Sequence, residues 1–129
     1  MTTRRAYSGA PWEKQVAYCR AKRVGNVIAV SGTVASDENG RPVAPGDVHA
    51  QTVYALRKIE KALVELGSGL RDVLRTRCFL LDMGRFDDFA RGHREVFEGI
   101  DPAASAVEVS RLVAPGYVVE IEVDAIVDD

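Results

Sequence analysis

Hydrophobic residues recur at helical spacing in two segments of the chain. The clearer segment is 47–66, where Asp47 can cap the start of a helix and Gly67 can end it. Its apolar positions lie three and four residues apart and form one stripe: Val53, Leu56, Ile59, Leu63 and Leu66. A second helix is predicted at about 84–98, with an inner stripe of Phe86, Phe89, Ala90, His93, Val96 and Phe97.

Alternating apolar and polar residues predict the strands. In the last segment, 117–127, one face carries Tyr117, Val119, Ile121, Val123, Ala125 and Val127, and the other carries Val118, Glu120, Glu122, Asp124 and Ile126. Residues 73–81 also alternate, with Leu74, Thr76, Cys78 and Leu80 on one face. A short strand is predicted at 105–110. Two β-like runs within 16–32, separated by Gly25-Asn26, indicate a hairpin.

The predicted order is strand, strand, helix, strand, helix, strand, strand. This order is typical of an α+β fold in which both helices pack on one face of a single sheet. Residues 1–15, which include Gly9 and Pro11, are expected to form an irregular N-terminal arm, and residues 16–129 one domain.

Two helices would leave the opposite face of the sheet uncovered. That face would carry Glu120, Glu122 and Asp124 together with arginines of the 73–81 strand. It is either a subunit interface, in which these acids pair with Arg75 or Arg77, or a solvated antiparallel face. An interface would place carboxylates in a desolvated cleft, where a raised pKa suits acid–base chemistry.

Composition narrows the classes of partner. The 129 residues include 17 Lys and Arg against 19 Asp and Glu, so the basic excess of a nucleic-acid-binding protein is missing. No apolar run approaches the roughly 18 residues of a membrane span, and the N-terminus lacks the apolar core of a secretory signal. Cys19 and Cys78 are too few for a disulfide framework and have no metal-ligand spacing. We therefore expect a cytoplasmic protein without a metal site.

Several short motifs together resemble one known family. They are Tyr18, Arg23–Asn26, Val30–Gly32, Gly46-Asp47, Gln51-Thr52, Ala55-Leu56, Leu70–Val73, Leu81–Met83 with Phe86, Pro102-Ala103, Ser105–Val109 and Val119–Glu122. On these residues, over roughly 16–127, the chain resembles the Rid family (RidA/YjgF), whose deaminating members hydrolyse reactive enamines and imines such as 2-aminoacrylate to ketoacids and ammonia.

The resemblance implies a chorismate-mutase-like fold, in the order β-β-α-β-α-β-β, assembled as a homotrimer. It implies clefts for a small-molecule ligand between adjacent subunits and a reaction without a cofactor. The family's catalytic glutamate corresponds to Glu120 and its tyrosine to Tyr18. Backbone groups near Gly32 and Ala106 correspond to positions that line the cleft.

The family's substrate-clamping arginine has no counterpart here. Deaminating members have the sequence P-A-R-S where this chain has Pro102, Ala103, Ala104 and Ser105. Ala104 cannot replace a bidentate guanidinium, and the loss of such a contact costs about 1.5–3 kcal/mol. We therefore expect an altered substrate rather than 2-aminoacrylate. The alternative is a non-catalytic small-molecule-binding or interaction module on the same scaffold. Ribonuclease activity has poor electrostatic support.

Three further residues are candidates for the cleft, each with a structural alternative. Arg20 is either a displaced cation that serves the cleft or a solvated strand residue. Trp12 either folds over the mouth of the cleft or anchors the arm. His93 is either a core histidine on the apolar stripe or a pH-sensitive group of the site.

Overall fold

The computed structural model describes residues 1–128 of the chain. The elements follow one another as β1 (Thr3–Ala6), α1 (Pro11–Val16), β2 (Ala21–Val24), β3 (Val27–Val34), α2 (Val48–Glu65), β4 (Val73–Leu80), α3 (Phe86–Phe97), β5 (Ala103–Glu108) and β6 (Val119–Ile126). Short 3₁₀ helices at Leu70–Asp72 and Met83–Arg85 lead into β4 and α3. None of the helices in residues 1–128 has both the length and the apolar character that crossing a membrane requires.

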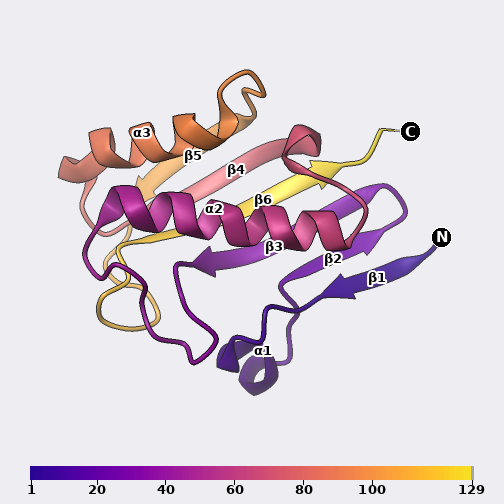
Figure 1. Cartoon of the computed structure of the whole chain (residues 1–129), viewed down its shortest axis with the longest axis horizontal. Helices are drawn as coiled ribbons and strands as arrows, with labels where there is room; N and C mark the ends of the chain where they lie inside the picture. The colour runs from indigo at the N-terminus through magenta and orange to yellow at the C-terminus, as the bar shows by residue number, and fades with distance from the viewer. Residues whose placement is uncertain (129) are drawn as a thin grey trace.

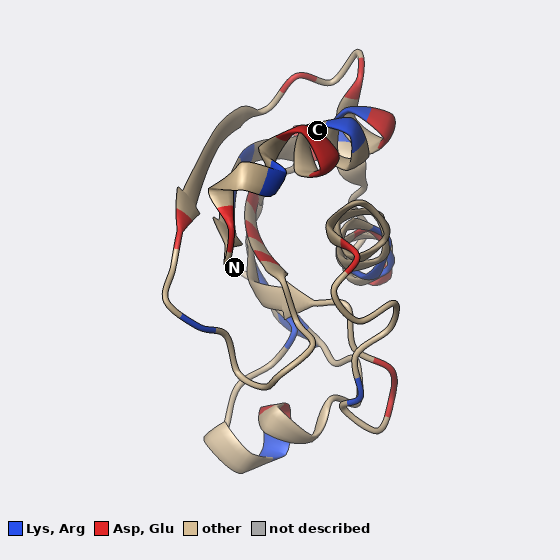
Figure 2. Ribbon diagram, turned by 90° about the vertical axis from the view of Figure 1, so that its left-hand side faces the viewer, with Lys and Arg blue, Asp and Glu red and all other residues tan. Residues whose placement is uncertain are grey.

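The strands form one mixed sheet in the order β1-β2-β3-β6-β4-β5. Neighbouring strands are antiparallel except for β4 and β5, which are parallel and joined through α3. The helices α2 and α3 lie side by side on the same face of the sheet (Figure 1). Seen from the side in Figure 2, the curved sheet keeps both helices on its one side. The predicted α+β fold with two helices on one face is confirmed.

Local sequence accounts for the bounds of α2. The Asp47 carboxylate accepts a hydrogen bond from the Ala50 amide at 3.0 Å, as a helix cap does. After the helix, Gly67 has a φ of +80°, a left-handed conformation that glycine adopts without strain. The predicted helix at 47–66 is therefore confirmed, and its buried face packs against the sheet to form the core.

The strict alternation of the last strand also holds. The side chains of Val119, Ile121, Val123 and Ala125 are buried in the core beneath the helices. Glu120, Glu122 and Asp124 therefore lie on the face that the helices leave uncovered. Arg77 of β4 reaches across this face, and its Nη1 lies 3.2 Å from Glu122 Oε1 and 3.1 Å from Asp124 Oδ2.

One position of β4 departs from the predicted alternation. Leu74 is expected on the inner face but is 55% exposed. The register between β4 and β6 shifts between Val73 and Arg75, so one extra residue is accommodated there. A bulge of this kind turns the extra side chain out of the alternation, which a pattern of period two cannot anticipate.

The N-terminal arm is more regular than expected. Residues 3–6 form β1, which pairs antiparallel with β2, and residues 11–16 form α1. The expectation of an irregular arm is therefore wrong for these two segments. Only Ala6 of β1 is buried, so the strand shows no apolar alternation. Backbone hydrogen bonds to the edge of β2 are what hold it as a strand.

A buried glutamine joins α2 to two loops. Gln51 is fully buried, and its Nε2 donates to the carbonyls of Val43 and Ala44 at 3.1 Å and of Gly116 at 2.8 Å. Its Oε1 accepts from the Val118 amide at 3.0 Å. The loop before α2 and the turn before β6 therefore share one side chain as their hydrogen-bond partner.

We predict that Gln51→Leu lowers the free energy of unfolding by roughly 3 kcal/mol, because it leaves several buried backbone groups without a partner. Denaturant titration at a fixed protein concentration measures this change. Gln15→Leu is the matched control, because Gln15 is exposed on α1. This variant is expected to unfold at the same denaturant concentration as the wild type. Equal stability of the two variants would contradict the role given to Gln51.

Candidate functional site

A bulge in β3 brings Gly32 against Glu120. The register between β3 and β6 shifts between Val30 and Thr33, which leaves an extra residue on β3. A Cβ atom added to Gly32 would overlap the carboxylate oxygen Oε2 of Glu120. Glycine at position 32 is therefore what leaves room for the Glu120 carboxylate on the sheet surface.

The surroundings of Glu120 favour its protonated form. Burial raises the pKa of the Glu120 carboxyl above its usual value, and the neighbouring Glu122 carboxylate adds to this rise. The Arg20 guanidinium opposes both effects and lowers the pKa of Glu120. The pKa of Glu120 is thus set by burial, by the Arg20 cation and by the Glu122 carboxylate.

Arg20 has all its donors engaged. Its Nε and Nη2 donate to Glu13 Oε2 at 3.1 and 3.0 Å. Its Nη1 donates to the Gly32 carbonyl at 2.7 Å and to Thr33 Oγ1 at 3.2 Å, and Nη2 also donates to the Tyr18 hydroxyl at 3.3 Å. A guanidinium has five N–H groups, so none is left over for a ligand carboxylate. At 3% exposure, Arg20 is not a solvated strand residue.

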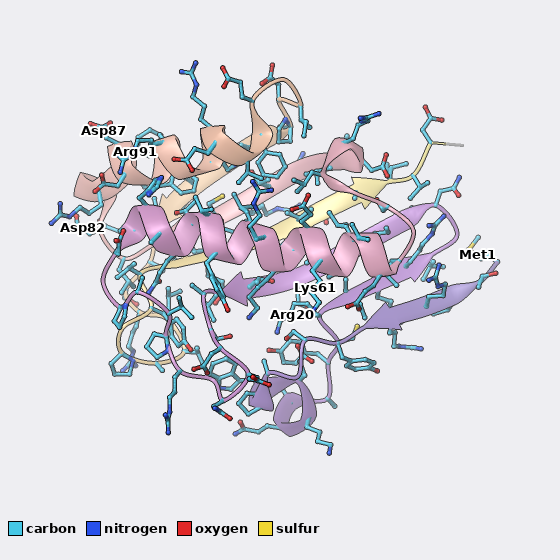
Figure 3. All side chains as sticks on the ribbon, viewed as in Figure 1. Met1, Arg20, Lys61, Asp82, Asp87 and Arg91 are labelled. Carbon is cyan, nitrogen blue, oxygen red and sulfur yellow. The ribbon has the colours of Figure 1, made fainter. Side chains whose placement is uncertain are left out.

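The partner of Arg20 comes from the N-terminal arm. Glu13 of α1 is buried and also accepts hydrogen bonds from the amides of Ser8 and Gly9. Burial alone would raise the pKa of Glu13, but the hydrogen bonds from Ser8 and Arg20 hold it below its usual value. Figure 3 labels Arg20 below α2, on the side of the molecule where α1 lies. The ion pair therefore fastens α1 beside Glu120.

Glu120, Gly32, Arg20 and Tyr18 line an open cavity, which we call the Glu120 cavity. It has a volume of about 540 Å³ and is lined, among others, by Trp12, Tyr18, Arg20, Gly32, Lys58 and Glu120. Trp12 also packs edge-on against Tyr117, with ring centroids 6.1 Å apart. Trp12 thus anchors the arm and forms a wall of the cavity.

Lys58 is a cavity residue that the sequence reading did not single out. Its Nζ donates to the carbonyls of Val34 and Ser36 at 3.3 and 3.2 Å and to the Ser36 hydroxyl at 2.8 Å. Burial, aided by the nearby Arg20, lowers the pKa of Lys58 to about 8. The sequence does indicate that Lys58 is partly buried, because position 58 lies on the same helical face as the buried Ala55 and Ala62 of α2.

A second cavity, the Ala104 cavity, lies between α3 and β5. It has a volume of about 640 Å³, and its walls include His93, Ala104, Ser105 and Ala106. His93 Nε2 lies 3.0 Å from the hydroxyl of the buried Thr76, which pairs with Ala104 across the sheet. Burial lowers the pKa of His93, so the imidazole is neutral at neutral pH.

The predicted site residues fall into two separate groups. Trp12, Tyr18, Arg20, Gly32 and Glu120 line the Glu120 cavity, and His93, Ala104, Ser105 and Ala106 line the Ala104 cavity. No residue belongs to both walls. One chain therefore does not bring all the predicted residues into one site. In the described part of the chain, no cluster of three or more His, Cys, Asp or Glu side chains could hold a metal ion.

Known proteins are similar to this chain in fold and in sequence. A solved structure of a member of the YjgF/YER057c/UK114 family from Mycobacterium tuberculosis is 40% identical, with a TM-score of 0.87, and the match covers 98% of this chain and 100% of that chain. A putative endoribonuclease from Thermotoga maritima is 28% identical, with a TM-score of 0.88, and the match covers 100% of both chains. The predicted chorismate-mutase-like fold is thus confirmed.

Two relatives bear the names of deaminases. The 3-aminoacrylate deaminase RutC of Acinetobacter baylyi is 35% identical over 104 residues, which cover 81% of this chain and 82% of the relative. The 2-iminobutanoate/2-iminopropanoate deaminase of Mus musculus is 31% identical over 109 residues, which cover 84% and 80%. The family model described as endoribonuclease L-PSP matches residues 10–127. On these matches, the chain belongs to the endoribonuclease L-PSP family, which is the Rid or YjgF family.

Proposed function

We propose that the protein hydrolyses an enamine or imine to a carbonyl compound and ammonia. The observation that carries this proposal is Glu120, a half-buried carboxyl group with a raised pKa that sits against Gly32 in a cavity. Two relatives that bear the names of deaminases support the same class of reaction.

The chemistry needs a proton acceptor and a group that polarises the imine. The Glu120 carboxylate takes a proton from water while the water oxygen adds to the imine carbon and the imine nitrogen takes a proton from the Tyr18 hydroxyl. Glu120 then returns its proton to the nitrogen of the carbinolamine. The C–N bond breaks, ammonia leaves, and the hydroxyl proton of the carbinolamine passes to the Tyr18 oxygen as the carbonyl forms. The Tyr18 oxygen accepts from Arg20, so its own hydroxyl proton is free to be donated to the ligand.

The cleft is proposed to lie between copies of the chain in a homotrimer. The Glu120 cavity of one subunit would then face the Ala104 cavity of its neighbour, which would unite the two groups of site residues. The uncovered sheet face supports such an assembly, because exposed apolar side chains such as Val27, Val107 and Ile126 lie among its charged residues.

The proposed substrate lacks a carboxylate at the position that an arginine would bind. Ala104 offers no donor, and the Arg20 donors are already engaged by Glu13, Tyr18, Gly32 and Thr33. Lys58, the other cation of this cavity, already donates from Nζ to the Val34 and Ser36 carbonyls and to the Ser36 hydroxyl. A carboxylate buried in this cleft would therefore lose its hydration without gaining a free cationic donor. Small imino acids are therefore poor substrates in this proposal.

We predict that Glu120→Gln lowers the enzymatic release of ammonia from an uncharged imine by about a hundredfold or more, since general base catalysis contributes that much. The imine is generated in the assay, and the uncatalysed rate is subtracted. Glu60→Gln is the control, because Glu60 pairs with Arg57 on the exposed side of α2, and it is expected to retain wild-type turnover. Ligand binding without turnover by the wild type would instead favour a non-catalytic binding module.

The pH dependence of the reaction tests the link between Arg20 and Glu120. A general base with a raised pKa loses activity as the pH falls through that pKa. In the double variant Glu13→Gln/Arg20→Gln the cation that lowers the pKa of Glu120 is gone, and both charges of the buried ion pair are removed together. The acid limb of kcat/KM is expected to move to higher pH. Arg57→Gln, which removes an exposed charge, should leave the limb in place.

The assembly itself can be measured by light scattering. We expect three times the mass of one chain for the wild type. Val107→Asp puts a charge on the uncovered face and is expected to weaken the assembly. Val64→Asp introduces the same charge on the exposed side of α2, away from the uncovered sheet face. This variant should form the same trimer as the wild type. A monomeric wild type would remove the proposed cleft.

A further inference from the structure

We propose that the Ala104 cavity is a specificity pocket for an uncharged, flat, unsaturated group of the ligand, such as an aromatic ring bearing a neutral polar substituent. That this pocket belongs to the substrate site rests on the proposed function. That it binds such a group does not, because α3 and β5 of a single chain form the cavity.

One wall of the cavity is a continuous aromatic row on α3. The ring centroids of Phe86 and Phe89 lie 5.8 Å apart, those of Phe89 and His93 5.6 Å, and those of His93 and Phe97 4.8 Å. These residues recur at spacings of three and four, so one side of the helix presents them together. A flat unsaturated ligand can extend this row by stacking or edge-on contact.

The facing wall is made of small side chains. Ala104 pairs with Thr76 and Ala106 with Cys78 in the parallel ladder of β4 and β5. Thr76 and Cys78 are buried on the helix side of the sheet, so the paired alanines face α3 as well. A long side chain at position 104 would occupy the space in front of the aromatic row. Alanine leaves it open.

The charges around the cavity disfavour an anion. Among the described residues that line it, Arg94 carries a positive charge, and its Nη2 is paired with Glu98 Oε1 at 3.1 Å. Asp101, also on the rim, adds a negative charge. A carboxylate placed here would meet one cation, Arg94, which lies on the exposed rim and is paired with Glu98, and it would be repelled by the Glu98 and Asp101 carboxylates.

His93 supplies one polar contact. Its Nε2 is engaged by Thr76. No hydrogen bond to Nδ1 is found within residues 1–128, and no buried side-chain nitrogen or oxygen there lacks a partner, so Nδ1 must be reachable from solvent. A neutral imidazole nitrogen at this wall can pair with an amide, hydroxyl or imine group of the ligand.

Calorimetric titration with benzamide and benzoate tests the pocket, since the two molecules share shape and differ in charge. We expect the wild type to bind benzamide at least about tenfold more tightly than benzoate. Ala104→Arg should reverse this preference by filling the space and adding a cation. Phe86→Ala, a truncation of a partly exposed ring, should weaken benzamide and leave the fold unchanged in a thermal melt.

Val64→Arg is the matched control, because it adds the same charge on the exposed side of α2 and should keep the wild-type preference. A wild type that prefers benzoate, or binds neither molecule, would overturn the inference. So would an Ala104→Arg variant with the wild-type preference. Loss of turnover in Glu120→Gln bears only on the proposed function, whereas the benzamide preference bears only on the pocket, so the two can fail separately.

Discussion

The buried ion pair between Arg20 and Glu13 is the contact on which the candidate site depends. Arg20 lies where β2 begins, and its guanidinium binds the backbone of the bulge in β3, the hydroxyl of Tyr18 and the helix α1 of the N-terminal arm. It also lowers the proton affinity of Glu120. One side chain therefore joins the arm, the bulge and the acid.

The energetics of such a pair explain why it can hold the arm in place. Breaking a buried pair by removing one partner costs about 3–5 kcal/mol, because the other charge is left without compensation. Pairing of β1 with β2 and the contact of Trp12 with Tyr117 also hold the arm, but α1 itself has six residues and Glu13 is its buried side chain. Docking of α1, and with it the position of Trp12, thus follows from burying the Glu13 carboxylate next to Arg20.

The two cavities differ in the chemistry that they would bring to the proposed cleft. Charged and proton-active groups gather around Glu120, where Arg20, Lys58 and Tyr18 form the walls. Aromatic and small apolar groups gather around Ala104. A substrate that spans both would have its reacting carbon in the first environment and its recognition group in the second, an arrangement that separates catalysis from specificity.

Most of the architecture could be predicted from the sequence, because period and capping act locally. The stripe that ends at Leu66, the cap at Asp47 and the alternation of 117–127 each place residues correctly without knowledge of distant contacts. The family motifs likewise identified Glu120, Gly32 and Tyr18, which do share a cavity. By contrast, β1 forms a strand because it pairs with β2, and its own residues show no periodic pattern that would predict one.

What the sequence determined by itself was the fold class and the family. Tertiary structure alone decided what surrounds the candidate site residues. It committed every Arg20 donor to Glu13 and its neighbours, turned Leu74 outward at a bulge, and placed Glu120 and Ala104 in different cavities. The physical reason is that hydrogen-bond partners, burial and the pKa values they set arise between residues far apart in the chain, which local periodicity does not encode.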